Sequence, residues 1–197
     1  MRAERITSDR VAAFSDGIFA VAVTVMVLDL KAPDRAAFSS LLPLWSTGVS
    51  YAVSYLFIAI IWINHHHLMR LVGPPTLRLI WINFIHLFLV SLLPFATSWI
   101  ARTELAPSPV AAYAGLFVCI DIAYNIFERE ILTHGEGERV PDRARRLARR
   151  RSLIVLGGFA TAAVVAFFAP LVGFGLVCAS LILHLRPDVT NSAAGAP

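Results

Sequence analysis

Residues 10–30 read RVAAFSDGIFAVAVTVMVLDL, and this stretch decides the fold class. It is an apolar run long enough to cross a membrane as a helix, which takes about 20 residues, yet it carries Asp16 near its start. Hydrophobic residues make up 57% of the 197-residue chain and charged residues only 15%, whereas a soluble domain has about 25% charged residues. The composition predicts an all-α integral membrane protein and excludes a soluble enzyme and a disordered chain.

Five further apolar segments follow this first one. We expect six transmembrane helices, at about 9–30, 41–68, 76–100, 109–132, 152–169 and 170–185. The run Gly73-Pro74-Pro75 separates the second helix from the third because proline cannot continue a helix, and Pro94 predicts a kink in the third. The polar residues 133–151 are expected to form a loop. Residues 1–186 then make one six-helix transmembrane domain, followed by a disordered tail at 187–197.

The positive charges are distributed unequally over the two sides of such a six-helix chain. The side with both termini, the second-to-third loop and the fourth-to-fifth loop holds fourteen of the seventeen arginines and lysines, and the other side holds Lys31, Arg35 and Arg102. Cytoplasmic loops carry the excess of positive charge, so both termini are expected in the cytoplasm. The high alanine and arginine content suggests a bacterial plasma membrane.

An arginine cluster at Arg143–Arg151 lies in the expected fourth-to-fifth loop. Two interpretations stay open for it: a topogenic signal, or a contact with anionic lipid. A nucleic-acid site is not expected in a loop this short, so the partners predicted here are membrane lipids and no nucleic acid.

Polar side chains of three helices lie at a similar depth on the cytoplasmic side. At about 1.5 Å per residue, Asp16 lies roughly 9 Å deeper than Arg10. Counting inward from Arg70 and Arg78 in the same way brings the following residues to that level: Asn64, His65, His66, His67, Asn83 and His86. A charge inside a spanning helix is expensive and marks function or an internal partner. We therefore predict a buried hydrogen-bond network around Asp16, which either ties helices together or relays ions or protons directly.

The outer half of the first helix carries a different pattern. Its residues at positions i, i+3, i+4 and i+7 share one face: Val21, Thr24, Val25 and Leu28. This face is apolar except for one hydroxyl, and Asp29 follows at its outer end. The residues alone leave open whether the stripe faces lipid, other helices or a pore.

Other groups carry weaker signals. Three consecutive histidines point to different helix faces, so a metal site at His65–His67 is not favoured. The fourth helix places Asp121, Asn125 and Glu128 on one face, where Asp121 makes an interhelical contact or serves as a proton-sensitive group. The chain has no potassium-filter sequence of the T-V-G-Y-G type, no phosphate-binding glycine loop and no nucleophile elbow. We therefore expect no enzyme activity and no cofactor.

Two motifs stand out in the first two helices. The first helix contains Arg10-x-x-x-Phe14-Ser15-Asp16-Gly17 and continues Ala20-Val21-x-x-Thr24-x-Met26-x-Leu28-x-Leu30, and the second contains Trp62-Ile-Asn64-His65-His66-His67. Together these motifs resemble the signature of the transmembrane protein 175 family, which comprises lysosomal potassium channels of animals and their bacterial relatives. With six expected helices, the resemblance covers essentially the whole chain.

The resemblance implies a potassium-permeable channel that lacks a carbonyl filter. The bacterial proteins of the family have one six-helix repeat and form homotetramers, whose first helix lines a central pore. The implied pore residues are Val21 at a hydrophobic constriction, then Thr24 or Val25, then Leu28, with Asp29 at the outer mouth. Potassium is the permeant ion and the only metal expected. The constriction of the family commonly has isoleucine or leucine, and the valine found here is one methylene smaller.

The resemblance also implies that a network at the start of the first helix positions the pore helix. This helix-positioning network comprises Arg10, Phe14, Ser15, Asp16, Asn64, His65, His66, His67, Asn83 and His86. The alternative function is a secondary cation/proton transporter that uses Asp16 or Asp121 as carrier. The sequence shows neither the inverted repeat nor the broken helix pair typical of such transporters.

Overall fold

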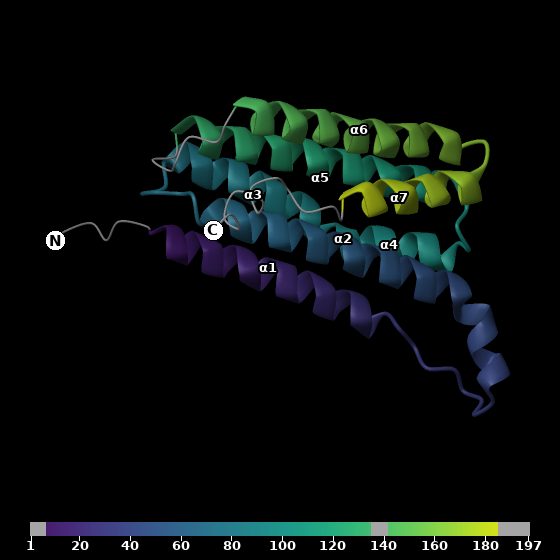
Figure 1. The fold of residues 1–197 in the computed structure, drawn as a ribbon. Helices are drawn as coiled ribbons and strands as arrows, with labels where there is room; N and C mark the ends of the chain where they lie inside the picture. The colour runs from purple at the N-terminus through teal and green to yellow at the C-terminus, as the bar shows by residue number, and fades with distance from the viewer. Residues whose placement is uncertain (1–6, 135–141, 185–197) are drawn as a thin grey trace, which may run out of the picture.

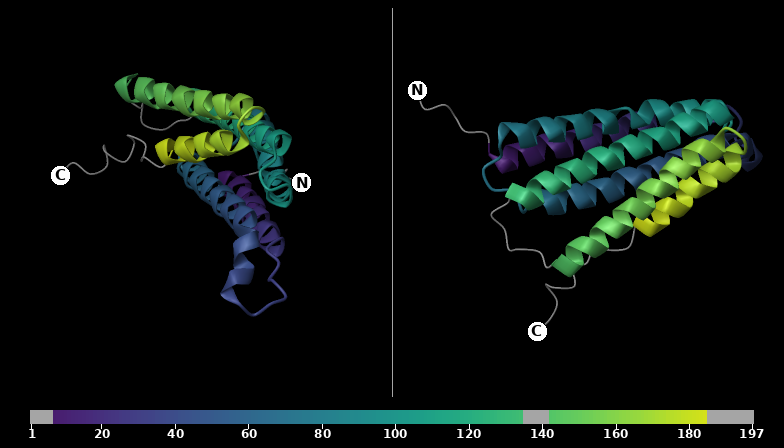
Figure 2. Two further views of the ribbon diagram at one scale, coloured as in Figure 1. Left: turned by 90° about the vertical axis from the view of Figure 1, so that its right-hand side faces the viewer. Right: turned by 90° about the horizontal axis from the view of Figure 1, so that it is seen from above.

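The computed structural model describes residues 7–134 and 142–184, and these residues are helical apart from short connections (Figure 1). One 3-10 helix, η1, spans Phe38–Leu44. The α-helices are α1 Ser8–Leu28, α2 Trp45–Met69, α3 Leu77–Ser91, α4 Leu93–Arg102, α5 Pro107–His134, α6 Asp142–Ala166 and α7 Pro170–His184. Their axes run side by side, with α1 at one edge of the bundle and α6 at another (Figures 1 and 2). The predicted tail at 187–197 lies outside the described residues.

Helix α1 begins at a capped end and buries one narrow stripe. The Thr7 side chain accepts a hydrogen bond from the backbone N–H of Arg10, which satisfies one of the donors that a helix start leaves free. The buried residues of α1 are Val11, Ser15, Phe19, Ala22 and Met26. They recur every three or four residues and pack against α2, α3 and α4. The remaining face of α1 is covered by no other part of the described chain.

The third expected helix is divided in two. Helix α3 ends at Ser91 and α4 begins at Leu93, with Leu92 between them. Pro94 has no N–H to donate to the carbonyl one turn earlier, so the regular ladder is interrupted there. The kink that the sequence predicts at Pro94 is thus a short break, and the two helices together form one span, Leu77–Arg102.

Helix α6 begins well before the sequence analysis placed it. The stretch 133–151 was expected to be a loop, but the helix starts at Asp142 and contains the Arg143–Arg151 cluster. Arginine, alanine and leucine are all good helix formers. The positive charge of the arginines does not oppose a helix in water. The side chains of 143–149 and of residue 151 lie outside the described ones.

Four helical segments of the described chain are long and apolar enough to cross a membrane: Ser8–Leu28, Phe38–Met69, Leu77–Arg102 and Pro107–Thr133. Two further apolar helices, Ser152–Ala166 and Pro170–Leu183, are shorter. The described residues thus form an all-helical protein with four segments long and apolar enough to span a membrane. Six crossings require the two short helices to cross as well.

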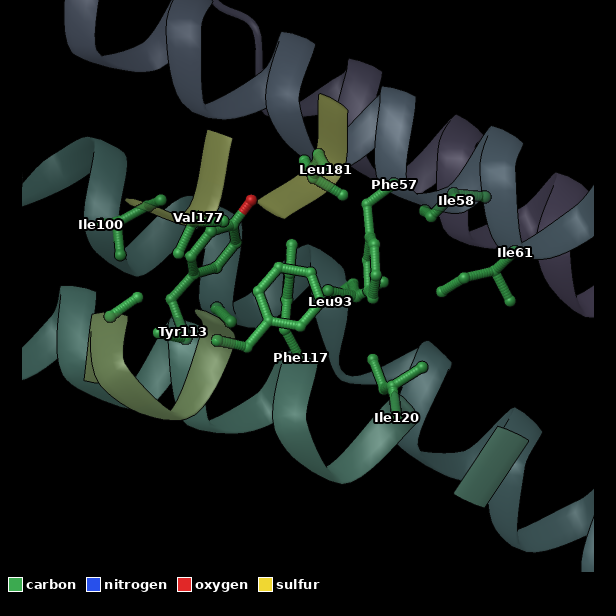
Figure 3. Close-up of a cluster of buried hydrophobic side chains, with 14 of the residues drawn as sticks. Phe57, Ile58, Ile61, Leu93, Ile100, Tyr113, Phe117, Ile120, Val177 and Leu181 are labelled. Carbon is green, nitrogen blue, oxygen red and sulfur yellow. The ribbon is translucent and has the colours of Figure 1, made fainter. Parts of the chain in front are cut away.

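An aromatic core joins α2, α5 and α6. The rings of Phe57 and Phe117 stack with centroids 3.7 Å apart, and Phe159 meets both edge-on. Figure 3 shows Phe57 and Phe117 surrounded by apolar side chains of α4, α5 and α7, among them Leu93, Tyr113 and Leu181. This core holds α2 and α4 in place, and α1 packs against both of these helices.

The turn between α6 and α7 depends on one glycine. A Cβ added at Gly173 would lie 2.8 Å from the Cα of Ala166, so the backbone of one helix would have to shift. We expect Gly173→Ala to destabilise the protein by about 1–3 kcal/mol through overpacking. Gly175→Ala, two residues along the same helix, is the matched control because a Cβ there meets nothing within 4 Å. The stability of both variants is measured by unfolding in mixed detergent micelles, followed by circular dichroism. Equal stability of the two variants would contradict the close contact between Gly173 and Ala166.

Candidate pore helix and its supporting network

The predicted pore stripe lies on the uncovered face of α1. Val21 is 58% exposed, Val25 43% and Leu28 79%, and Thr24 is also exposed. These side chains lie away from the buried stripe of α1, so a single chain leaves an apolar surface without protein contact. In a membrane, either lipid or another protein chain must cover this exposed stripe of α1.

The hydroxyl of Thr24 has a fixed orientation. Its Oγ1 donates to the backbone carbonyls of Ala20 at 2.8 Å and of Val21 at 2.9 Å. The proton is therefore directed back toward the helix, and the oxygen lone pairs are directed outward. An outward-facing oxygen acceptor suits a cation better than an anion.

A directed chain of buried hydrogen bonds connects the N-terminal half of α1, the C-terminal half of α2 and the middle of α3. His65 Nε2 donates to Asn83 Oδ1 at 2.9 Å, Asn83 Nδ2 donates to Ser15 Oγ at 3.0 Å, and Ser15 Oγ donates to the carbonyl of Val11 at 2.8 Å. All three side chains are fully buried. These three bonds link side chains of all three helices and so fix the rotation of α1 against its neighbours, although His65 Nδ1 has no hydrogen-bond partner within the described chain.

Asp16 lies beside this chain and has a different partner. The indole N–H of Trp62 donates to Asp16 Oδ1 at 2.8 Å, and Trp62 in turn stacks on His66 with centroids 5.7 Å apart. The buried network therefore centres on Asn83, whereas the sequence analysis placed Asp16 at its centre. Trp62 is a functional candidate that the sequence analysis quoted without giving it a role. Its position one turn before His65, at the depth of Asp16, is the signal that could have identified it.

The other residues of the predicted polar layer differ in their burial and in their contacts. Phe14 meets Phe84 edge-on at 5.5 Å between centroids. His86 is fully buried and stacks with Phe127 and His65, and within the described chain its ring nitrogens have no hydrogen-bond partner. In contrast, three members are exposed: Arg10, His66 and His67. Asn64 is half-buried. The histidine run is thus divided between buried and exposed faces, and among the described residues no three potential ligands lie together as a metal site.

The C-terminal end of α1 forms one ion pair. Asp29, which caps the helix, lies 3.7 Å from the guanidinium of Arg102 at the end of α4; the Arg102 side chain is largely exposed and that of Asp29 partly exposed. Such a pair contributes about 0–1 kcal/mol. The nearby arginine also offsets part of the charge that Asp29 would present to a cation.

Asp121 makes an interhelical contact through Asn125. The Asn125 side-chain amide donates to the backbone carbonyl of Asp121 at 2.7 Å and to its carboxylate at 3.3 Å, and the oxygen of that amide accepts from Ser152 on α6. Asp121 is only 5% exposed. It lies on α5, which does not contact the exposed stripe of α1, so this carboxylate is separate from the candidate pore face.

Known proteins resemble both the sequence and the fold. Residues 10–94 match the family described as endosomal/lysosomal potassium channel TMEM175. A potassium channel of Chryseobacterium sp. is 33% identical over 184 residues, which cover 93% of this chain and 95% of that protein. The chain belongs to the TMEM175 family. This confirms the resemblance identified in the sequence, and the TMEM175 family is one of ion channels and not of enzymes.

Two further relatives extend the comparison. The crystal structure of a lysosomal potassium-selective channel TMEM175 homolog from Chamaesiphon minutus matches with a TM-score of 0.79 at 28% identity, covering 91% of this chain and 97% of that one. The human protein, named endosomal/lysosomal proton channel TMEM175, is 32% identical over 114 residues, which cover 50% of this chain and 23% of the human one. The fold of this TMEM175 chain is therefore that of a solved channel.

Proposed function

We propose that this chain is a potassium-permeable channel, assembled as a homotetramer around a pore lined by α1. One observation carries the proposal: Val21, Thr24 and Leu28 are exposed on a helix whose opposite face is fixed by a buried network. One helix cannot enclose a pore, but four copies related by rotation can, and the exposed stripe of each copy then faces the axis. Potassium channels among the relatives support this assignment.

The constriction works through the chemistry of its side chains. Four copies of Val21 form an apolar ring, and such a ring excludes water and ions when narrow and passes them when it widens. Valine is smaller than the isoleucine or leucine implied by the family resemblance. The closed ring of this protein is accordingly expected to be wider, so that it holds back water less strongly.

Thr24 supplies oxygen ligands one turn further out. Because each hydroxyl proton is donated to the carbonyls of Ala20 and Val21, its oxygen lone pairs are available to a partly dehydrated cation. Potassium loses its hydration water more easily than sodium, so a ring of such oxygens favours potassium modestly. Asp29 adds a weak attraction for cations at the outer mouth, reduced by Arg102.

The buried network positions α1 and does not touch the permeant ion. Ser15 and Asn83 face the bundle interior, on the opposite side of α1 from the pore stripe. The bond from Trp62 to Asp16 orients the same turn of the helix. We assign both contacts the role of setting the rotation and tilt of the pore helix.

The orientation in a bacterial plasma membrane follows from charge and from tryptophan. Trp45 and Trp99 lie toward the end where α2 begins and α4 ends, and Trp62 and Trp81 lie toward the opposite end; all four are 39–60% exposed, as in the aromatic belts at the two membrane surfaces. We place both termini in the cytoplasm, with α6 and α7 as the fifth and sixth crossings. Anionic lipid is the proposed partner of Arg143–Arg151.

Flux through the purified protein in potassium-loaded liposomes tests this function. We expect passive, electrogenic efflux that is faster when potassium is the permeant ion than when sodium is. A parallel measurement with a pH-sensitive dye follows proton flux, because the human relative is named a proton channel. Flux that occurs only when coupled stoichiometrically to a proton gradient would overturn the channel in favour of a transporter using Asp16 or Asp121.

A further inference from the structure

A groove runs beside the candidate pore stripe. It has a volume of about 710 Å³ and lies between α1 and the α3–α4 pair. Its walls include Ile18, Val21 and Val25 from α1 and Pro94, Phe95 and Trp99 from α4, and the ion pair between Asp29 and Arg102 borders its outer end. Phe95 is 69% exposed and Trp99 39%. The groove is thus a largely apolar depression on the surface of the chain. One of its wall residues, Val21, also belongs to the proposed constriction.

The position of the groove limits what can fill it. If it stayed open to water, ions could pass along it beside Val21, and the apolar ring would not close the pore. A working constriction therefore needs this groove to be occupied along the length of Val21 and Val25. In a ring of four α1 helices, the adjacent α1 is the element that lies there, because packed helix axes are only about 8–10 Å apart.

The two flanks of α1 differ in a way that fits this arrangement. Successive residues of a helix turn by about 100°, so Val21 and Val25 flank the pore direction on the groove side. Ala20 and Val27 flank it on the other side at the depth of the groove, and both are exposed. A small residue such as Ala20 lets helices approach closely in membranes. The chain thus presents a groove with aromatic walls on one flank and a narrow ridge on the other, as a head-to-tail ring requires of its two unlike surfaces.

We infer that the groove of each subunit holds the Ala20–Val27 flank of the next subunit's α1, with Phe95 and Trp99 of α4 forming the outer wall of the contact. This inference rests on the proposed tetrameric pore and adds to it the surface that closes the ring. It assigns α4 a direct part in the interface between subunits. Lipid acyl chains are the competing occupant of the groove.

Cysteine cross-linking tests the contact in the full-length chain. In a background with Cys119 and Cys178 replaced by serine, Ala20→Cys is combined with Phe95→Cys and the protein is oxidised in membranes. Because Ala20 does not line the groove of its own chain, the bond must form between subunits. We expect a ladder of dimer, trimer and tetramer for the double variant and monomer for each single variant.

Val21→Cys in the same background separates the two proposals. Four Val21 side chains around one axis are expected to cross-link in pairs. Dimers from Val21→Cys without a ladder from the double variant would overturn the groove contact and leave the pore in place. Absence of both products would overturn the proposed pore itself.

A bulky substitution gives a second, independent readout. Ala20→Trp is expected to convert most of the tetramer to smaller species in size-exclusion chromatography with light scattering. Ala112→Trp, at an exposed alanine of α5, is the matched control and is expected to remain tetrameric. Retention of the tetramer by Ala20→Trp would contradict the contact.

Discussion

A Val21→Asn variant is expected to pass potassium about tenfold faster than the parent protein, or more. Each subunit then replaces an apolar side chain at the constriction with an amide that binds water, so the closed ring stays wet. A tenfold increase corresponds to a barrier lowered by about 1.4 kcal/mol, which is small compared with the hydration that four amides supply. Potassium efflux from liposomes at equal protein density measures the change.

The control for this variant is Val164→Asn on α6. Val164 is 62% exposed, as Val21 is at 58%, but it lies far along the chain from the candidate pore face. Its efflux should equal that of the parent. Unchanged efflux in Val21→Asn, with normal assembly, would mean that Val21 does not form the constriction.

An Asn83→Leu variant is expected to lose both stability and correct positioning of α1. Leucine fills a similar volume but offers neither the acceptor for His65 nor the donor for Ser15. Leaving a buried polar group without its partner costs about 1–3 kcal/mol, and the rotation of α1 is no longer specified. Unfolding in mixed detergent micelles measures the stability, and liposome flux measures the effect on the pore.

The matched control is Thr161→Ala on α6. Thr161 is exposed, and its hydroxyl donates to the carbonyl of Gly157 one turn earlier. It should behave like the parent in both measurements. If Asn83→Leu retained parent stability and flux, the directed chain through Asn83 would be incidental to the pore.

The sequence predicted the polar layer better than its connections. Depth counting from flanking arginines brought Asp16, His65 and Asn83 to one level, because the rise of a helix per residue is constant. It could not say which groups bond, since that depends on the rotation of each helix. For this reason Asp16 was taken as the centre of the network, and the role of Trp62 was missed.

The sequence indicated the break at Pro94 and did not indicate where α6 begins. The break at Pro94 follows from a missing backbone donor, which the sequence shows directly. The early start of α6 does not, because arginine marks both a solvated loop and a solvated helix. The exposed stripe of α1 gained its meaning from the family resemblance, since exposure in one chain cannot distinguish lipid from a pore.

The unequal attachment of α1 at its two ends has a mechanical consequence. Near its start, Ser15 and Asp16 bond to α3 and α2, whereas the last side chain that α1 buries is Met26, beyond which Asp29 forms one ion pair with Arg102. In the proposed pore, a tilt about the turn at Ser15 moves each residue in proportion to its distance from that turn. Val21 lies about 9 Å from Ser15 and Leu28 about 20 Å, so a tilt that widens the ring at Val21 displaces Leu28 roughly twice as far. We therefore expect opening of the proposed pore to widen its Leu28 end more than its constriction.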